Sequence, residues 1–397
     1  MRKILRILLV SIIGLLILPL HMHAQESSSE LKIGCLSMTS GAAAAMGLSF
    51  ARGGAMAIED WNAKGGIKIG ETKYKLKYIV EDSKYRSEAG VAAAKKLVLT
   101  DGVKFVLGPN AGVVGAATVK PIFTPNKVIT LPISFTSKVL GPDKPYSFRV
   151  QLSALEYSTA AYELFAKMYP DIKEVVSIKI DDESGYAAAK DVRKAMETVG
   201  IKIMSDEFFA RRTTDFYPLC TRVIAKKPPL IDLFSLCGTD EANVIKQLRE
   251  LGYTGMLLGM GITPNVLWDI AGKAATGYFM AISFDMSSPL MTKEQNVFAR
   301  RYLARYGEPA LFESQSGYEG LFILLQAIEK AQTFDTGIVA RTLESLTGKT
   351  PLSKVPISWG GKMRYGIAHQ FNCPTYLTAM KEDGSLDLLA KGVANVP

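Results

Sequence analysis

The chain has 397 residues, of which 48% are hydrophobic, and 47 basic against 38 acidic side chains give a formal net charge of +9. This length suits two ordinary domains, each with a packed core. Because basic and acidic residues are interspersed, the charge indicates a solvated surface and argues against a nucleic-acid partner. No low-complexity linker or short repeat divides the sequence, so two lobes would have to be joined by crossing strands.

The first predicted element is an export signal at the N-terminus. Three basic residues precede an apolar run over residues 7–20, and Ala24 follows shortly after. This order is typical of a secretory signal peptide, so we expect residues 1–24 to be removed and the mature protein to be soluble and periplasmic. An uncleaved anchor is the alternative, but the apolar run is short for a membrane span.

Strand and helix patterns alternate through the first part of the mature chain. Buried or alternating apolar runs predict strands at residues 31–37, 74–82, 103–108 and 128–134. Helical spacing predicts helices at residues 47–66, 87–102 and 117–127. The segment "GPDKPYSFRV", residues 141–150, then interrupts the series.

The same rhythm restarts after this interruption. Helices are predicted at residues 154–170, 185–200, 215–229 and 241–253. Strands are predicted at residues 174–181, 201–209, 230–237 and 255–261. Two consecutive series of this kind predict an α/β protein with two doubly wound, Rossmann-like lobes.

The turn "LGPNAG" follows the predicted strand 103–108. In an open parallel sheet, ligands bind outside the carboxyl ends of the strands, where this turn lies. Gly112 and Gly115 permit close approach to the backbone, and free amides at a helix N-terminus attract an anion such as a carboxylate. A plain strand-to-helix turn is the alternative interpretation.

Motifs for catalysis and for metal or cofactor binding are absent from the sequence. Two of the three histidines lie in the signal peptide, so His369 is the only one in the mature chain, and no G-x-S-x-G elbow, Walker loop or complete dinucleotide fingerprint is present. We therefore expect no catalytic residue, no cofactor and no metal. An exported hydrolase would have to use His369, which fits a structural role better.

The four cysteines, Cys35, Cys220, Cys237 and Cys373, do not form a metal-binding pattern. They allow three disulfide connectivities, which the sequence does not settle. Cys220 and Cys237 are the best candidates for proximity, because both would lie at the carboxyl edge of one sheet. Buried free thiols are the interpretation that we favour.

Several segments resemble one family in chain order. They include "ARGGAMAIEDWNAKGGI", "DGVKFVLGPNAG", "TDFYPLCTRVIAKKP" and "SGYEGLFILLQAIEKAQTFD". The chain is similar to periplasmic type I solute-binding proteins, specifically the branched-chain amino acid binding group of ABC transporters (the leucine/isoleucine/valine-binding proteins). This resemblance implies two α/β lobes joined by three crossovers that close on a small ligand.

The resemblance also implies where the lobes divide. It places the crossovers near residues 146–152, 278–284 and 352–357. The N-terminal lobe would then comprise residues 30–148 plus 283–351. The C-terminal lobe would comprise residues 149–282 plus 352–397.

Candidate ligand-binding residues follow from the resemblance one position at a time. In the N-terminal lobe, "LPISFTS" resembles the loop that binds the ligand carboxylate in this family. Ser134 and Thr136 are its expected hydroxyl donors, and the backbone of Ala111 and Gly112 supplies amides. The candidates in this lobe are Met46, Asn110, Ala111, Gly112, Ser134, Phe135 and Thr136.

The candidates in the C-terminal lobe are Ser184, Tyr186, Gly238, Thr239 and Met260. Met260 stands where amino acid binders of this family carry an acidic residue that pairs with the amino group of the ligand. A buried ammonium without a carboxylate costs on the order of several kcal/mol. We therefore expect a carboxylate with an apolar or aromatic body, and the alternative is an amino acid whose amino group pairs with Asp181 or Asp240.

The resemblance implies capture and delivery of a ligand rather than catalysis. The ligand would bind the N-terminal lobe first, and contacts made only in the closed form would shift the hinge equilibrium toward closure. An ABC transporter permease would then recognise the closed form of a monomer. The alternative is a sensory module that hands its ligand to a receptor or regulator.

Overall fold

The structure, a computed structural model, describes residues 29–41, 43–181, 183–210, 212–236, 238–262, 264–286 and 288–397, apart from the side chains at positions 183, 184 and 187. The predicted signal peptide, residues 1–24, and Cys237 lie outside the described residues. Among the helices within these ranges, none is both long and apolar enough to cross a membrane.

The first sheet has five strands in the order β2-β3-β1-β4-β5. Four of them are parallel, and only β2 runs antiparallel to its neighbour β3. The strands are β1 (Ser29–Ser37), β2 (Ile67–Ile69), β3 (Thr72–Asp82), β4 (Phe105–Asn110) and β5 (Ile129–Ile133). The carboxyl ends of β1, β3, β4 and β5 therefore meet at one edge.

Helices cover both faces of this sheet. Its helices are α1 (Ala44–Ala63), α2 (Ser87–Lys95), α3 (Gly112–Thr118), α9 (Lys293–Tyr306), α10 (Phe312–Ala331) and α11 (Thr336–Glu344). Short π-helical turns, Lys96–Thr100 and Val119–Phe123, prolong α2 and α3. Adjacent β1 residues Cys35 and Leu36 belong to different hydrophobic clusters, as the alternation of side chains along a strand requires.

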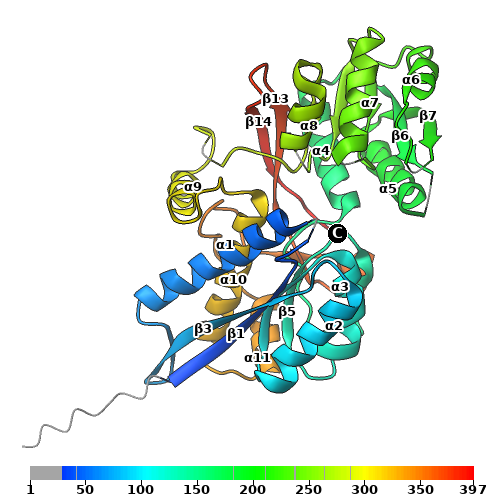
Figure 1. Cartoon of the computed structure of the whole chain (residues 1–397). Helices are drawn as coiled ribbons and strands as arrows, with labels where there is room; N and C mark the ends of the chain where they lie inside the picture. The colour runs from blue at the N-terminus through cyan, green and yellow to red at the C-terminus, as the bar shows by residue number, and fades with distance from the viewer. Residues whose placement is uncertain are drawn as a thin grey trace, which may run out of the picture.

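Glycines let α1 and α10 approach each other closely. A Cβ added at Gly53 would lie 2.0 Å from the carbonyl oxygen of Ser314, and one at Gly317 would lie 2.3 Å from that of Phe50. Such distances leave no room for a side chain. The chain therefore returns late in the sequence to pack α10 directly against the first helix (Figure 1).

The second sheet has seven strands in the order β14-β13-β10-β9-β8-β6-β7. The strands are β6 (Glu174–Ile180), β7 (Lys202–Phe209), β8 (Leu230–Asp232), β9 (Met256–Gly259), β10 (Phe279–Met280), β13 (Pro374–Met380) and β14 (Leu386–Val393). The helices of this half are α4 (Ala154–Met168), α5 (Glu183–Val199), α6 (Tyr217–Ile224), α7 (Gly238–Glu250) and α8 (Pro264–Ala271). Figure 1 shows these helices, in green, on the other side of the molecule from α1 and α10.

One predicted strand is shorter than expected. The sequence predicts a strand over residues 230–237, but β8 ends at Asp232. The side chain of Asp232 is fully buried, and its Oδ1 accepts the backbone N–H of Phe234 at 3.3 Å and the hydroxyl of Tyr162 at 3.0 Å. These hydrogen bonds turn the chain directly after the third strand residue.

Extended segments join the two halves. The N–H of Phe148 donates to the carbonyl of Thr130 in β5 at 2.9 Å. The next residue, Arg149, donates its N–H to the carbonyl of His369 at 2.9 Å, and its own carbonyl accepts the N–H of Phe371 at 2.9 Å. The small strands β11 (Trp359–Gly360) and β12 (Gln370–Phe371) and the single-turn helix α12 (Lys362–Tyr365) lie in this returning segment. The predicted class, an α/β fold with two lobes, is confirmed, whereas the exact lobe boundaries stay a prediction.

Candidate functional site

A cavity of about 90 Å³ lies at the carboxyl edge of the first sheet. It is bounded by the ends of β1, β4 and β5, by the start of α10, by Gln151 of the crossing segment and by Ile262 from the second half of the molecule. Its lining residues are Met38, Met46, Tyr85, Asn110, Ala111, Gly112, Ile133, Ser134, Phe135, Gln151, Ile262, Phe312 and Glu313. We call it the edge cavity.

Six of the seven predicted residues of the N-terminal lobe line the edge cavity, namely Met46, Asn110, Ala111, Gly112, Ser134 and Phe135. The seventh, Thr136, is adjacent, because a Cβ added at Gly112 would lie 3.3 Å from its methyl group and 3.4 Å from the hydroxyl of Ser134. The "LGPNAG" turn and the "LPISFTS" loop are thus brought together, as expected for neighbouring parallel strands.

The backbone of the turn is tightly held. Ala111 has a φ of 106°, and its N–H donates to the carbonyl of Ile133 at 3.3 Å, so this amide is used within the protein. The side-chain amide of Asn110 donates to the hydroxyl of Ser37 at 3.3 Å. Helix α3 begins at Gly112, which leaves the amides of its first turn as the free backbone donors.

The two hydroxyls of the neighbouring loop are oriented by the backbone. Ser134 Oγ accepts the N–H of Thr136 at 3.3 Å, and Thr136 Oγ1 accepts the N–H of Lys138 at 3.2 Å. A hydroxyl that accepts a hydrogen bond still has its own O–H to donate. Both groups can therefore donate to an anionic ligand.

Arg149 fixes the position of this loop from the crossing segment. Its side chain is fully buried, and Nη1 donates to the carbonyl of Thr136 at 3.0 Å. Nη2 donates to Glu156 at 3.1 Å. Burial alone would raise the pKa of Glu156, but the charge of Arg149 and hydrogen bonds from Ser153 and Tyr365 lower it below the usual value. Sequence analysis missed Arg149, because a lone arginine in an irregular segment carries no pattern.

Glu313 is a second residue that sequence analysis missed. It lies in the first turn of α10, lines the edge cavity and is only 4% exposed. Burial raises the pKa of its carboxyl from 4.5 to about 8. An acidic residue in the first turn of a helix is ordinarily explained by the helix dipole, so the sequence alone gave no reason to single it out.

Four predicted residues of the C-terminal lobe have described side chains or backbone, namely Tyr186, Gly238, Thr239 and Met260, and none of them lines the edge cavity. Tyr186 is 54% exposed and donates its hydroxyl to Asp181, and Gly238 and Thr239 start helix α7 at the end of the second sheet. Met260 is 5% exposed and packs within the main hydrophobic cluster. The side chain of Ser184 lies outside the described residues. Ile262, two residues after Met260, is the contribution of this half.

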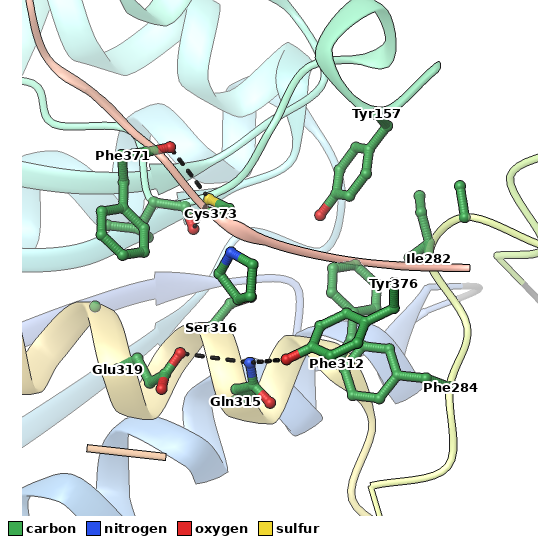
Figure 2. A pocket seen from close by; sticks show the side chains of 14 residues that line it. Tyr157, Ile282, Phe284, Phe312, Gln315, Ser316, Glu319, Phe371, Cys373 and Tyr376 are labelled. Atoms are coloured by element: carbon green, nitrogen blue, oxygen red, sulfur yellow. Dashed lines mark hydrogen bonds between the residues drawn. The ribbon is translucent and has the colours of Figure 1, made fainter. Parts of the chain in front are cut away.

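A second, smaller cavity of about 30 Å³ adjoins the first through Phe312, which lines both (Figure 2). Figure 2 shows residues of α10 facing the segment that contains Cys373 and Tyr376. Glu319 of α10 accepts the N–H groups of Leu352 and Ser353 at 3.1 and 2.7 Å. Helix α10 therefore connects the edge cavity with the segments that cross between the halves.

The structure assigns His369 a structural role. Its ring stacks on Phe148 with the ring centroids 3.8 Å apart, and its two nitrogens lie 3.1 Å from the carbonyl of Ser147 and 2.8 Å from Glu344. Among the described residues, neither partner atom is a hydroxyl or a thiol, so the ring is not paired with a nucleophile of the serine or cysteine type. Within the part of the chain that the structure describes, no cluster of three potential metal ligands occurs.

Three cysteines are free and buried: Cys35, Cys220 and Cys373. Burial raises the pKa of the thiols of Cys35 and Cys220 to about 12. The predicted proximity of Cys220 and Cys237 stays a prediction, because Cys237 lies outside the described residues.

The chain belongs to the periplasmic binding protein family, whose model matches residues 30–385. Among curated proteins it is similar to the Leu/Ile/Val-binding protein BraC3 of Rhizobium johnstonii, with 25% identity over 351 residues that cover 86% of this chain and 89% of the relative. The family resemblance drawn from the sequence segments is confirmed.

Solved structures show the same fold. A branched-chain amino acid ABC transporter periplasmic ligand-binding protein from Burkholderia xenovorans matches with a TM-score of 0.79 and 17% identity, over 92% of this chain and 96% of that one. A solute-binding protein of an ABC transporter from Rhodopseudomonas palustris BisB5, in complex with 3,4-dihydroxybenzoic acid, matches with a TM-score of 0.71 and 21% identity, over 92% and 98%. The predicted fold, that of a type I periplasmic binding protein, is confirmed.

Proposed function

We propose that this protein is the extracytoplasmic solute-binding component of an ABC importer and captures a small organic carboxylate in the edge cavity. The observation that carries the proposal is the gathering of Met46, Asn110, Ala111, Gly112, Ser134 and Phe135 around one cavity at the carboxyl edge of a parallel sheet. The similar proteins bind leucine, isoleucine and valine, or 3,4-dihydroxybenzoic acid, according to their names. All of these ligands carry a carboxylate.

The lining of the cavity supports this ligand class. The hydroxyls of Ser134 and Thr136 and the first amides of α3 supply donors. Met38, Phe135 and Ile262 supply apolar surface. A few convergent polar groups beside apolar side chains are typical of a small-molecule site.

The proposed mechanism is capture by closure, without catalysis. The ligand binds the first-sheet edge, and residues of the second half, such as Thr239 and Tyr186, contact it only after the lobes close. The lobes of this proposal are those of the sequence analysis, with residues 30–148 plus 283–351 closing against residues 149–282 plus 352–397. The protein acts as a periplasmic monomer after cleavage near Ala24 and delivers its ligand to a permease.

A thermal-shift screen of the mature protein tests the proposal. The panel contains branched-chain amino acids, aromatic and aliphatic carboxylates, and the corresponding neutral amides. A ligand at a hundredfold its dissociation constant stabilises the native state by about 2.7 kcal/mol, which raises the melting temperature by a few degrees. A response to amides but not to carboxylates would overturn the proposed ligand class.

The control for this screen is Gly112→Val. The added methyl groups enter the corner of the cavity beside Ser134 and Thr136, so the variant should fold but show a smaller response. An undiminished response in Gly112→Val would place the ligand elsewhere. Transport is separated from sensing by uptake of the same ligand into cells that carry or lack the permease.

A further inference from the structure

Glu313 is the one charged side chain among the described residues that line the edge cavity. It is more than nine-tenths buried. No hydrogen bond or ion pair joins its carboxyl group to another described residue, and its only favourable polar contact is with its own backbone amide. The carboxyl group therefore lies in the cavity wall without a partner from the fold.

The other buried glutamates that the structure describes each have at least one hydrogen-bond partner. Glu319, two turns further along α10, accepts hydrogen bonds from Leu352 and Ser353. Glu156 pairs with Arg149. A buried acidic group without such partners is costly, so the position of Glu313 calls for a partner that arrives with the ligand.

We propose that Glu313 selects ligands that carry a cationic nitrogen in addition to the carboxylate, and that binding of such a ligand releases a proton. This inference rests on the proposed function. The protonated carboxyl group loses its proton to solvent, and the resulting carboxylate pairs with the ammonium group of the ligand. No lysine, arginine or histidine lines the cavity in the described part of the chain, so this pair is not disturbed by a competing cation.

The proton must come from Glu313 itself. Among the described residues, the other titratable side chain of the cavity lining is the phenol of Tyr85, and Glu313 interacts electrostatically with the phenol of Tyr157 in α4. Burial raises the pKa of Tyr157 well above 10, so it stays protonated at neutral pH. With its pKa raised to about 8, Glu313 is mostly protonated at pH 7 in the unliganded protein.

Glu313 can take the part that an acidic residue at position 260 plays in amino acid binders. The loss of an acidic residue at Met260 suggested a ligand without an amino group, because a buried ammonium needs a carboxylate. Glu313 supplies that carboxylate from the start of α10 instead of from the second sheet. A ligand with a cationic nitrogen is therefore compatible with a methionine at position 260.

Two matched pairs of probes test the inference by titration calorimetry. Each pair differs by an amino group: phenylalanine with 3-phenylpropanoate, and 4-(aminomethyl)benzoate with 4-methylbenzoate. We expect the amine-bearing member of at least one pair to bind at least about tenfold more tightly at pH 8. The binding enthalpy is measured in two buffers with different ionisation enthalpies, and the difference gives the number of protons released. With a pKa of about 8, Glu313 is about nine-tenths protonated at pH 7, so we expect release of about 0.9 proton per ligand.

The pH dependence of the affinity has a defined sign. Because binding requires ionised Glu313, affinity for the amine-bearing probe should rise about tenfold per pH unit below 8 and level off above it. Glu313→Gln should abolish this dependence and the proton release, while carboxylate-only probes keep their affinity within about twofold. Glu329→Gln, on the same helix, is the matched control and should behave as wild type, because the Glu329 carboxylate accepts a hydrogen bond from the exposed Lys68 amide outside the edge cavity.

The outcomes separate the two proposals. Tighter binding of carboxylate-only probes without proton release would overturn the role of Glu313 and leave the proposed function intact. Binding of neither member of any pair, and of no carboxylate in the thermal-shift panel, would overturn both. If Glu313→Gln does not fold, the proton count and pH dependence of the wild-type protein still decide the question.

Discussion

The carboxyl edges of the two sheets differ in how far they are organised before a ligand arrives. At the first edge, Asn110 and Ser134 are buried, and hydrogen bonds hold the loops around a cavity. At the second edge, Tyr186 and Thr239 are exposed, and Met260 is used in the core. The first edge is therefore preorganised for a ligand, whereas we expect the second to contribute by closing over it.

The strongest test of this comparison is Arg149→Ala. The guanidinium holds the carbonyls of the Ser134–Thr136 loop and is paired with Glu156 inside the protein. Removing it takes the closest cation from buried Glu156 and leaves only Arg364 at 3.5 Å, which should lower the free energy of unfolding by roughly 3 kcal/mol and weaken ligand binding. Urea denaturation and calorimetry measure the two effects.

A surface arginine provides the control for this variant. Arg301 pairs with Asp60 at 2.6 Å, but both side chains are partly exposed. Arg301→Ala should therefore cost no more than about 1 kcal/mol and leave ligand affinity unchanged. Equal effects of the two substitutions would contradict the special role of Arg149 in organising the first edge.

Gly112→Val should block the first edge with little effect on folding. The backbone of Gly112 is helical, so a side chain causes no conformational strain, but its Cβ would already lie 3.3 Å from Thr136 and 3.4 Å from Ser134. We expect affinity to fall by about tenfold to a hundredfold, measured by calorimetry. Ala116→Val, on an exposed position one turn later in α3, adds comparable bulk and should bind normally.

The pH dependence of stability separates the two regions further. Burial raises the pKa of Glu241, in the second half, and of Glu313 to about 8 from an unfolded value of 4.5. The native state then binds more protons than the unfolded state between these values, so stability should fall as pH rises from 5 to 8, by on the order of 3 kcal/mol per group. Urea denaturation of the unliganded protein across this range measures the slope.

Substitution of Glu241 or Glu313 shows how much each residue contributes to the change of stability with pH. Glu241 accepts the hydroxyl of the buried Tyr278 and lies away from the edge cavity. Glu241→Gln should flatten the stability profile without changing ligand selectivity, whereas Glu313→Gln should change both. A profile that is unaltered in both variants would show that neither group is protonated in the native state at pH 7.

Most of the architecture could be predicted from the sequence, because periodic apolar patterns record which faces are buried. The first strand and the helix after it were expected at residues 31–37 and 47–66 and occur at Ser29–Ser37 and Ala44–Ala63. The first-edge loops were also predictable, since they follow the ends of buried strands. The ligand-contacting role of each predicted residue stays a prediction.

The remaining features depend on contacts between distant segments. Arg149 acts on a loop that precedes it by 13 to 15 residues and on a tyrosine 216 residues later, which no local pattern records. Glu313 has the position of an ordinary helix-dipole residue, and only the return of α10 against α1 brings it to the cavity. Strand β8 ends at Asp232, whose carboxylate accepts a hydrogen bond from the hydroxyl of Tyr162, 70 residues away in the sequence.

The smallest predicted effect comes from comparing the same substitution at both edges. Thr136→Ala removes a hydroxyl beside the edge cavity, so affinity for a carboxylate ligand should fall by about threefold to tenfold, the value of one hydrogen bond. Thr239→Ala removes an exposed hydroxyl at the second edge and should change affinity by no more than about twofold. Calorimetry with the tightest-binding ligand of the panel measures both affinities. For Thr239→Ala the dissociation rate of the ligand is the more sensitive quantity, because contacts made on closure slow the release of the ligand. A larger loss for Thr239→Ala than for Thr136→Ala would reverse the assignment and make the second edge the principal site of recognition.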